Sequence, residues 1–106
     1  MHRQVELLYF EGCPNWQQTR ALLEHVSSEL HLEIDLRLVE VADPDAAVEL
    51  RFLGSPTVRV NGRDVEPGAD GRRAYSFACR VYRTEHGFSG QPDAVWIRKA
   101  LSESAA

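Results

Sequence analysis

Hydrophobic and polar positions follow two different periods in the first half of the chain. Residues 5–10 form a short, nearly continuous apolar run that ends at Gly12, which predicts a central strand covered on both faces. Residues 33–41 alternate with a period of two and have one mostly apolar face, which predicts a second strand. Between them, apolar residues recur at helical spacings, which predicts an amphipathic helix over 14–30. The inner face of this helix is predicted to carry Trp16, Leu22, Leu23, Val26 and Leu30.

Proline marks the start of two further predicted helices. Asp43-Pro44 is a start signal for a short helix that stops at Gly54. Pro92 is predicted to open the last helix, because a proline fits the first helical position. The inner face of that last helix is predicted to carry Ala94, Ile97 and Leu101.

The strongest local signal is Asn61-Gly62, which lies between two short alternating runs at 57–60 and 63–66. This arrangement favours a two-residue type I′ turn and an antiparallel hairpin. The register that follows sets Val60 opposite Arg63 and Val58 opposite Val65.

The pattern weakens over residues 67–91, where glycines interrupt it and where 74–82 fits a short strand or a helical turn equally well. The predicted order of elements is β-α-β-α-β-β-α, with 67–91 before the last helix. A strand, a crossover helix and a second strand make a right-handed parallel unit. With the hairpin, the chain is expected to form one α/β domain over 1–106, a four-stranded mixed sheet flanked by helices.

Composition and charge exclude several classes of partner. The chain has 106 residues, of which 43% are hydrophobic and 26% charged, and its net charge is −4 with both signs mixed along the sequence. This argues against nucleic acid and a membrane surface as partners, since both would require concentrated basic residues. No apolar run approaches the ~20 residues that span a bilayer, and residues 1–4 do not resemble a signal peptide, so a cytoplasmic location is expected.

Cys13 is the first candidate for chemistry. Pro14 fits the first helical position, which would make Cys13 the N-cap of the first helix. Free backbone N–H groups and the helix dipole at that end favour a thiolate, which is both a nucleophile and a ligand for soft metals. Cysteine is not a preferred N-cap residue, so a functional thiol is expected here.

The order of elements resembles the thioredoxin-like fold, on two further features. Cys13-Pro14-Asn15-Trp16 stands at the end of the first strand, in the place of the family's Cys-x-x-Cys motif, and Ser55-Pro56-Thr57 precedes the third strand, where the family carries a cis-proline. The resemblance covers residues 4–66 and 92–102, so that 67–91 looks like an insertion. The chain is similar to small bacterial thioredoxin- or glutaredoxin-like proteins, some of them labelled as related to alkylmercury lyase, although it shows no separate lyase motif of two cysteines and an aspartate.

The resemblance implies a set of substrate-binding residues. A cis peptide bond before Pro56 would turn the Ser55 backbone towards an extended peptide or glutathione beside Cys13. The implied binding residues are Pro14, Trp16, Ser55, Pro56 and Thr57, although Trp16 fits a core or shoulder role better. Trp16 also replaces the family's second cysteine, so the dithiol cycle cannot run within the motif.

Cys79, inside the insertion, has two interpretations. It is a thiol packed between Phe77 and Val81, or it is a resolving thiol or second metal ligand that reaches Cys13 if the segment folds over the first helix. The insertion is also locally basic, and its arginines would favour a thiolate or receive an anionic thiol such as glutathione. The arginines in question are Arg72, Arg73, Arg80 and Arg83.

Three functions follow from these residues. The first is thiol–disulfide exchange at Cys13, with Cys79, glutathione or a protein thiol as the resolving group and no cofactor. The second is binding of a soft metal ion such as Hg²⁺, Cu⁺ or Zn²⁺ by thiolates. The third is a redox-silent module that binds a partner through the groove at Pro56 or through the insertion.

Overall fold

The elements follow the predicted order, and the insertion adds three short ones. A computed structural model describes residues 3–103. The core elements are β1 (Arg3–Tyr9), α1 (Trp16–Glu29), β2 (Ile34–Glu40), α2 (Pro44–Glu49), β3 (Thr57–Val60), β4 (Arg63–Asp64) and α3 (Ala94–Glu103). The insertion contains the short 3₁₀ helix η1 (Ala69–Gly71) and the hairpin strands β5 (Tyr82–Thr84) and β6 (Gly87–Ser89).

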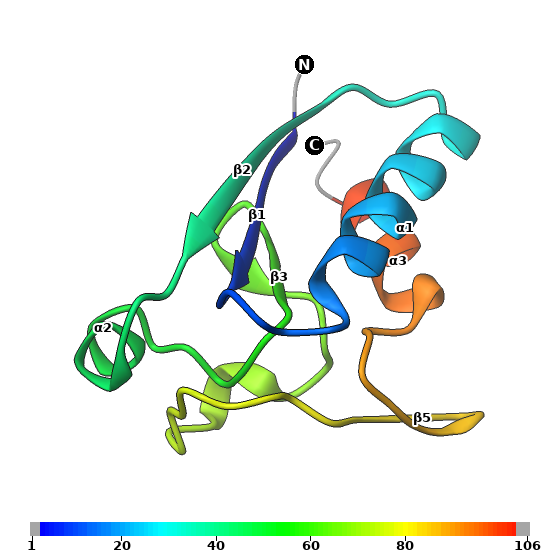
Figure 1. The fold of residues 1–106 in the computed structure, drawn as a ribbon. Helices are drawn as coiled ribbons and strands as arrows, with labels where there is room; N and C mark the ends of the chain where they lie inside the picture. Colours follow the sequence, from blue (N-terminus) through cyan, green and yellow to red (C-terminus); the bar gives the residue numbers. More distant parts are fainter. Residues whose placement is uncertain (1–2, 104–106) are drawn as a thin grey trace.

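The four main strands form one mixed sheet in the order β2-β1-β3-β4 (Figure 1). β1 pairs in parallel with β2 and antiparallel with β3, and β3 pairs antiparallel with β4. β1 is therefore a central strand, as its apolar run predicted, and Val5, Leu7 and Leu8 are fully buried. The architecture is that of a small α/β protein with a four-stranded mixed sheet and three α-helices.

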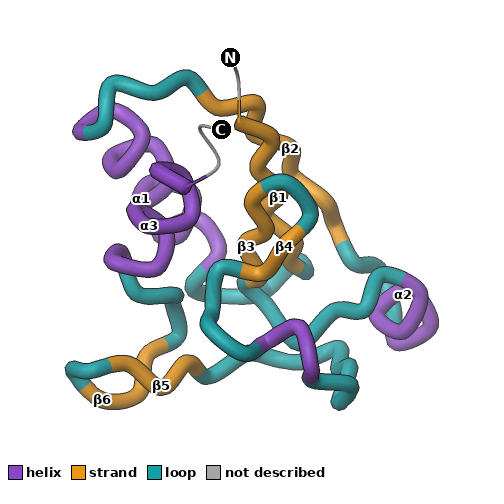
Figure 2. Tube along the Cα trace, turned by 180° about the vertical axis from the view of Figure 1, so that it is seen from behind, coloured by secondary structure: helices purple, strands orange, loops and turns teal. Residues whose placement is uncertain are grey.

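The helices lie on opposite sides of the sheet. α1 and α3 lie side by side over one face, and α2 lies at the other side, beyond the end of β2 (Figures 1 and 2). The larger core cluster joins the first face to α1 and α3 through Leu7, Leu23 and Ile97. A smaller cluster, Leu8, Val41, Ala47 and Phe52, fixes α2 to the sheet.

Two helices begin two residues later than predicted. The first i→i−4 hydrogen bond of α1 runs from the Thr19 N–H to the Asn15 carbonyl, so Asn15 and not Cys13 is the N-cap. In the same way Asp93, the residue after Pro92, accepts a hydrogen bond from the Val95 N–H at 2.8 Å and precedes α3. In both places the residue after the proline supplies the carbonyl that starts the helix, and the proline lies in the preceding turn.

α2 is shorter than predicted but starts as expected. Pro44 is its first residue and the Asp43 side chain accepts the Ala46 N–H at 2.8 Å. The helix ends at Glu49 rather than near Gly54, because Arg51 turns left-handed at φ 55°. This turn directs Phe52 into the core, where it is fully buried.

The Asn61-Gly62 hairpin is confirmed. Both turn residues have positive φ, 51° and 83°, as a type I′ turn requires. Val60 lies opposite Arg63, and the Val65 N–H donates to the Val58 carbonyl at 3.1 Å. β4 itself ends at Asp64, two residues earlier than predicted.

Of residues 74–82, which the sequence left open between a strand and a helical turn, only Tyr82 lies in a strand, as the first residue of β5, and residues 74–81 are irregular. An isolated parallel bridge pairs Cys79 with Ser55. Within residues 3–103, no helix has both the length and the apolar character that a membrane span requires.

Candidate functional site

Two loops meet at one end of the sheet. One, residues 10–15, follows β1, and the other, residues 53–56, precedes β3. Because β1 and β3 are antiparallel neighbours with Leu8 opposite Thr57, the end of β1 and the start of β3 lie at the same edge. The topology therefore brings the Cys13 loop and the Pro56 loop together, and the Ser55–Pro56 peptide bond is cis.

Cys13 is a buried free thiol. It retains 6% of its surface, and its N–H donates to the Phe10 carbonyl at 3.2 Å, which closes the turn after β1. Since the helix begins at Trp16, Cys13 lies outside the first turn and its expected N-cap position is wrong. The backbone N–H groups left free at the start of α1 therefore belong to residues that follow the Cys13 loop, and not to the loop itself.

The main chain of Ser55 is occupied by the insertion. Residues 76–80, called the strap from here on, run parallel to residues 52–55. The Ser76 N–H donates to the Phe52 carbonyl, the Ser55 N–H donates to the Ala78 carbonyl and the Arg80 N–H donates to the Ser55 carbonyl, each at 2.9 Å. The sequence implied that Ser55 would present these groups to a substrate, and the strap holds both of them instead.

Cys79 lies at the middle of the strap and is an exposed free thiol. The interpretation that it packs between Phe77 and Val81 is wrong, because Val81 is 64% exposed and Phe77 turns to the Phe10 ring, with 5.0 Å between centroids. The Cys79 backbone pairs with Ser55 at the edge of the sheet where the Cys13 loop lies. The insertion therefore carries the second thiol to the same end of the molecule as the first.

A buried ionic network anchors the strap. The Arg80 side chain is 3% exposed and donates to both carboxylates of the β4 edge, to Asp64 at 2.8 and 3.2 Å and to Glu66 at 2.7 Å. It also donates to the Thr57 hydroxyl at 2.9 Å and lies 4.3 Å from the centre of the Tyr82 ring. Burial by itself disfavours the charge of Arg80, but Tyr82, Asp64 and Glu66 outweigh it and raise its pKa above the ordinary value.

The predicted substrate residues around Pro56 are all buried. The Thr57 hydroxyl donates to the Gly54 carbonyl at 2.6 Å, and the Tyr82 hydroxyl donates to the Pro56 carbonyl. The Ser55 hydroxyl is fully buried and has no hydrogen-bond partner within residues 3–103. Ser55, Pro56 and Thr57 thus contact the insertion in this conformation.

The other two predicted substrate residues, Pro14 and Trp16, lie at the start of α1. Pro14 is exposed in the turn before α1. Trp16 stacks on Tyr9, with 4.1 Å between ring centroids and 22° between planes, and packs against the larger core cluster. The stacked and partly buried ring of Trp16 fits the core and shoulder role that the sequence favoured.

The far end of the insertion also touches the Cys13 loop. An added Cβ at Gly90 would lie only 2.2 Å from the Asn15 side-chain nitrogen, so only a glycine fits there without a shift of Asn15. The Gln91 side chain donates to that of Gln18 at 2.8 Å. The insertion therefore contacts the loop on both sides of Cys13, through Phe77 on Phe10 and through Gly90 on Asn15.

Two of the four arginines of the insertion are paired with carboxylates. Arg72 makes a bidentate pair with Glu66, at 2.8 and 2.9 Å, and Arg80 is bound as described. Arg73 and Arg83 are exposed. In the described part of the chain, no group of three or more His, Cys, Asp or Glu side chains is arranged to hold a metal ion.

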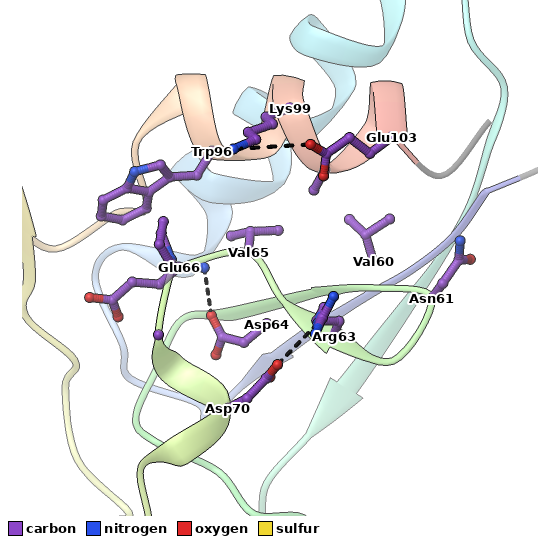
Figure 3. Close-up of a pocket in the computed structure, with 13 residues that line it drawn as sticks. Val60, Asn61, Arg63, Asp64, Val65, Glu66, Asp70, Trp96, Lys99 and Glu103 are labelled. Carbon is purple, nitrogen blue, oxygen red and sulfur yellow. Dashed lines mark hydrogen bonds and ion pairs between the residues drawn. The ribbon is translucent and has the colours of Figure 1, made fainter. Parts of the chain in front are cut away.

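A separate groove of about 500 Å³ lies between the β3–β4 hairpin and α3 (Figure 3). Val60, Val65 and Trp96 supply its apolar wall, and charged side chains including Asp64, Lys99 and Glu103 surround it. Neither cysteine lines this groove. No sequence pattern indicated this groove, because its two walls are some thirty positions apart in the chain and meet only through the fold.

The sequence matches no protein-family model, and a comparison with curated protein sequences finds no significant match.

Proposed function

We propose that the chain has a thioredoxin-like fold and is a thiol-based redox protein whose nucleophile is Cys13. The observation that carries the proposal is the meeting of three segments at one end of the sheet. These are the Cys13 loop after β1, the Ser55-Pro56-Thr57 loop before β3, and the Cys79 backbone paired with Ser55. The sheet order and strand directions agree with this fold, since a parallel β1–β2 pair is extended by an antiparallel hairpin.

The proposed reaction begins with attack of the Cys13 thiolate on one sulfur of a disulfide such as glutathione disulfide. A Cys13–glutathione mixed disulfide forms, the original disulfide bond breaks, and the released glutathione thiolate takes up a proton from solvent. Cys79, as a thiolate, then attacks the Cys13 sulfur, forms a Cys13–Cys79 disulfide and releases the second glutathione. Two protein thiols are oxidised while one disulfide is reduced to two thiols.

Cys79 suits the resolving role because it is exposed and lies on the same edge of the sheet. A disulfide requires the Cα atoms of its two cysteines to lie within about 7 Å of each other. For a larger separation of Cys13 and Cys79, the backbone of the strap would have to move towards Cys13 before the bridge forms. Where Cys79 does not resolve the intermediate, a second glutathione does so by attack on the same mixed disulfide.

The soft-metal alternative stays a prediction: the described residues contain no group of three or more His, Cys, Asp or Glu side chains arranged to hold a metal ion, so such a site would rest on the two thiols. The redox-silent alternative differs from the proposal in one observable, which is whether Cys13 reacts at all.

The test is mass spectrometry of the reduced protein after incubation with glutathione disulfide, with alkylation of the remaining thiols. We expect a Cys13–Cys79 disulfide in the unmodified chain and a Cys13–glutathione adduct that accumulates in Cys79→Ser. Cys13→Ser is the matched control, in which Cys79 reacts as an ordinary exposed thiol. If Cys13 stays reduced in all samples, the redox proposal is wrong and the redox-silent module takes its place.

A further inference from the structure

The strap occupies the main-chain groups through which a polypeptide would be held next to Cys13. An extended peptide that binds by strand addition needs a free N–H and a free carbonyl on the receiving strand. At Ser55 both are already bonded within the chain, to Ala78 and Arg80 at 2.9 Å. Strand addition by a substrate at this position therefore requires the strap to leave.

The strap is held too firmly to leave without cost. Arg80 is buried between Asp64 and Glu66, and its backbone lies so close to the Pro56 loop that an added Cβ at Gly54 would approach Arg80 Cβ to 2.8 Å. Release would expose a guanidinium and two carboxylates that are now paired.

Access to Cys13 is narrow for a second reason. Only 6% of its surface is exposed, and the insertion contacts the loop on both sides of it, at Phe10 through Phe77 and at Asn15 through Gly90. The cysteine of glutathione carries only one residue on each side, whereas a disulfide within a polypeptide brings a longer backbone on both sides of its cysteine to this covered thiol.

We infer that the strap makes Cys13 selective for low-molecular-weight disulfides and excludes extended polypeptides from the Ser55 main chain. The inference rests on the proposed function, because it names the substrate class of the same thiol. The residues that determine the selectivity are those that hold the strap in place.

The test compares two activated disulfides with the same pyridyl leaving group. One is formed on glutathione and the other on the central cysteine of a short unstructured peptide. For each compound, the rate of reaction with the protein is divided by its rate of reaction with free cysteine. Both rates are measured on the Cys79→Ser variant, so that Cys13 is the thiol that reacts. The two lost main-chain hydrogen bonds predict a preference for the glutathione compound of roughly tenfold or more.

A variant that loosens the strap tests the cause of this preference. Ser76→Pro combined with Phe77→Ala removes the hydrogen bond to Phe52 and the ring contact with Phe10, and leaves the buried ionic network intact. The peptide rate should rise by a larger factor than the glutathione rate, and the Ser55 and Arg80 amides should exchange with solvent roughly tenfold faster. Phe88→Ala is the matched control, because Phe88 belongs to the same insertion and is 77% exposed.

The possible outcomes separate the two proposals. If the unloosened protein reacts with the peptide as fast as with glutathione, the selectivity inference is wrong and the redox proposal stands. If neither compound reacts at Cys13, the redox proposal itself fails. If the loosened variant does not fold, the selectivity inference is still tested on the Cys79→Ser protein without the loosening substitutions. The two measurements are the ratio of its glutathione and peptide rates and the protection of its Ser55 and Arg80 amides from exchange.

Discussion

Arg80 is the buried charge on which the contact between the insertion and the sheet depends. Its guanidinium binds Asp64, Glu66 and the Thr57 hydroxyl, and Arg72 adds a second positive charge at Glu66. The two arginines balance the two carboxylates, so the network is neutral as a whole. Removal of Arg80 is costly, because Asp64 then stays buried without its ionic partner and Glu66 keeps only Arg72.

Arg80→Ala is therefore expected to lower the free energy of unfolding by about 3–5 kcal/mol, since it leaves Asp64 and Glu66 without their buried partner. Urea denaturation followed by circular dichroism measures the loss. Arg83→Ala removes an exposed arginine from the same insertion and should change the stability by no more than about 0.5 kcal/mol. Equal effects of the two substitutions would show that the buried network does not stabilise the fold.

At the scale of elements, the strap and the Pro56 loop behave as one unit. Gly54 permits this contact in two ways. Its φ of 124° is strained for any other residue, and the absence of a Cβ leaves room for the Arg80 backbone and the Ala78 carbonyl. The helices follow local capping rules, whereas the strap depends on this one close approach.

Gly54→Ala should consequently cost more than a glycine substitution elsewhere. We expect a loss of about 2–5 kcal/mol, in which backbone strain of about 1–2 kcal/mol adds to the collision with the strap. Gly68→Ala is the matched control, because Gly68 also has a positive φ, 82°, but its Cβ would meet nothing within 4 Å. Thermal unfolding of both variants gives the comparison, and losses of the same size would argue against a tight contact at Gly54.

At the scale of the whole molecule, buried phenols link stability to alkaline pH. Burial raises the pKa of Tyr82 far above its usual value, and the nearby charges of Asp64 and Glu66 act in the same direction, while Arg80 and the nearby Thr57 hydroxyl oppose them. The pKa of Tyr9 is also raised, first by burial and then by Glu40 and Glu11.

The sign of the pH effect follows from the protons that each state binds. Above about pH 10 an unfolded tyrosine loses its proton while the folded protein keeps that of Tyr82. The folded state then binds more protons, so the contribution of Tyr82 to stability is constant below about pH 10 and falls above it, by up to about 1.4 kcal/mol per pH unit.

Urea denaturation between neutral and alkaline pH should show this fall in the unmodified chain and a shallower one in Tyr82→Phe. Tyr9→Phe serves for comparison, since Tyr9 lies outside the insertion. An unchanged slope in Tyr82→Phe would mean that the phenol of Tyr82 is not held neutral by the fold.

The sequence by itself determined the features that depend on neighbouring residues. The period of apolar positions located β1, α1 and β2, Asp43-Pro44 located the start of α2, and Asn61-Gly62 fixed the hairpin and its register. These succeeded because hydrophobic period, capping and turn geometry act over a few positions. The starts of α1 and α3 were misplaced by two residues, because Pro14 and Pro92 are equally compatible with a turn just before a helix.

Only the tertiary structure decided how the insertion meets the candidate site. The pairing of Ser55 with residues 78–80, the burial of Arg80 between Asp64 and Glu66, and the contact of Gly90 with Asn15 all join positions far apart in the chain. No local pattern encodes such contacts, since an arginine in a glycine-interrupted segment is as compatible with solvent as with a buried ion pair. The sequence identified Cys13 and Cys79 as the thiols to examine, and the fold placed an exposed Cys79 and a covered Ser55 at the edge where the Cys13 loop lies.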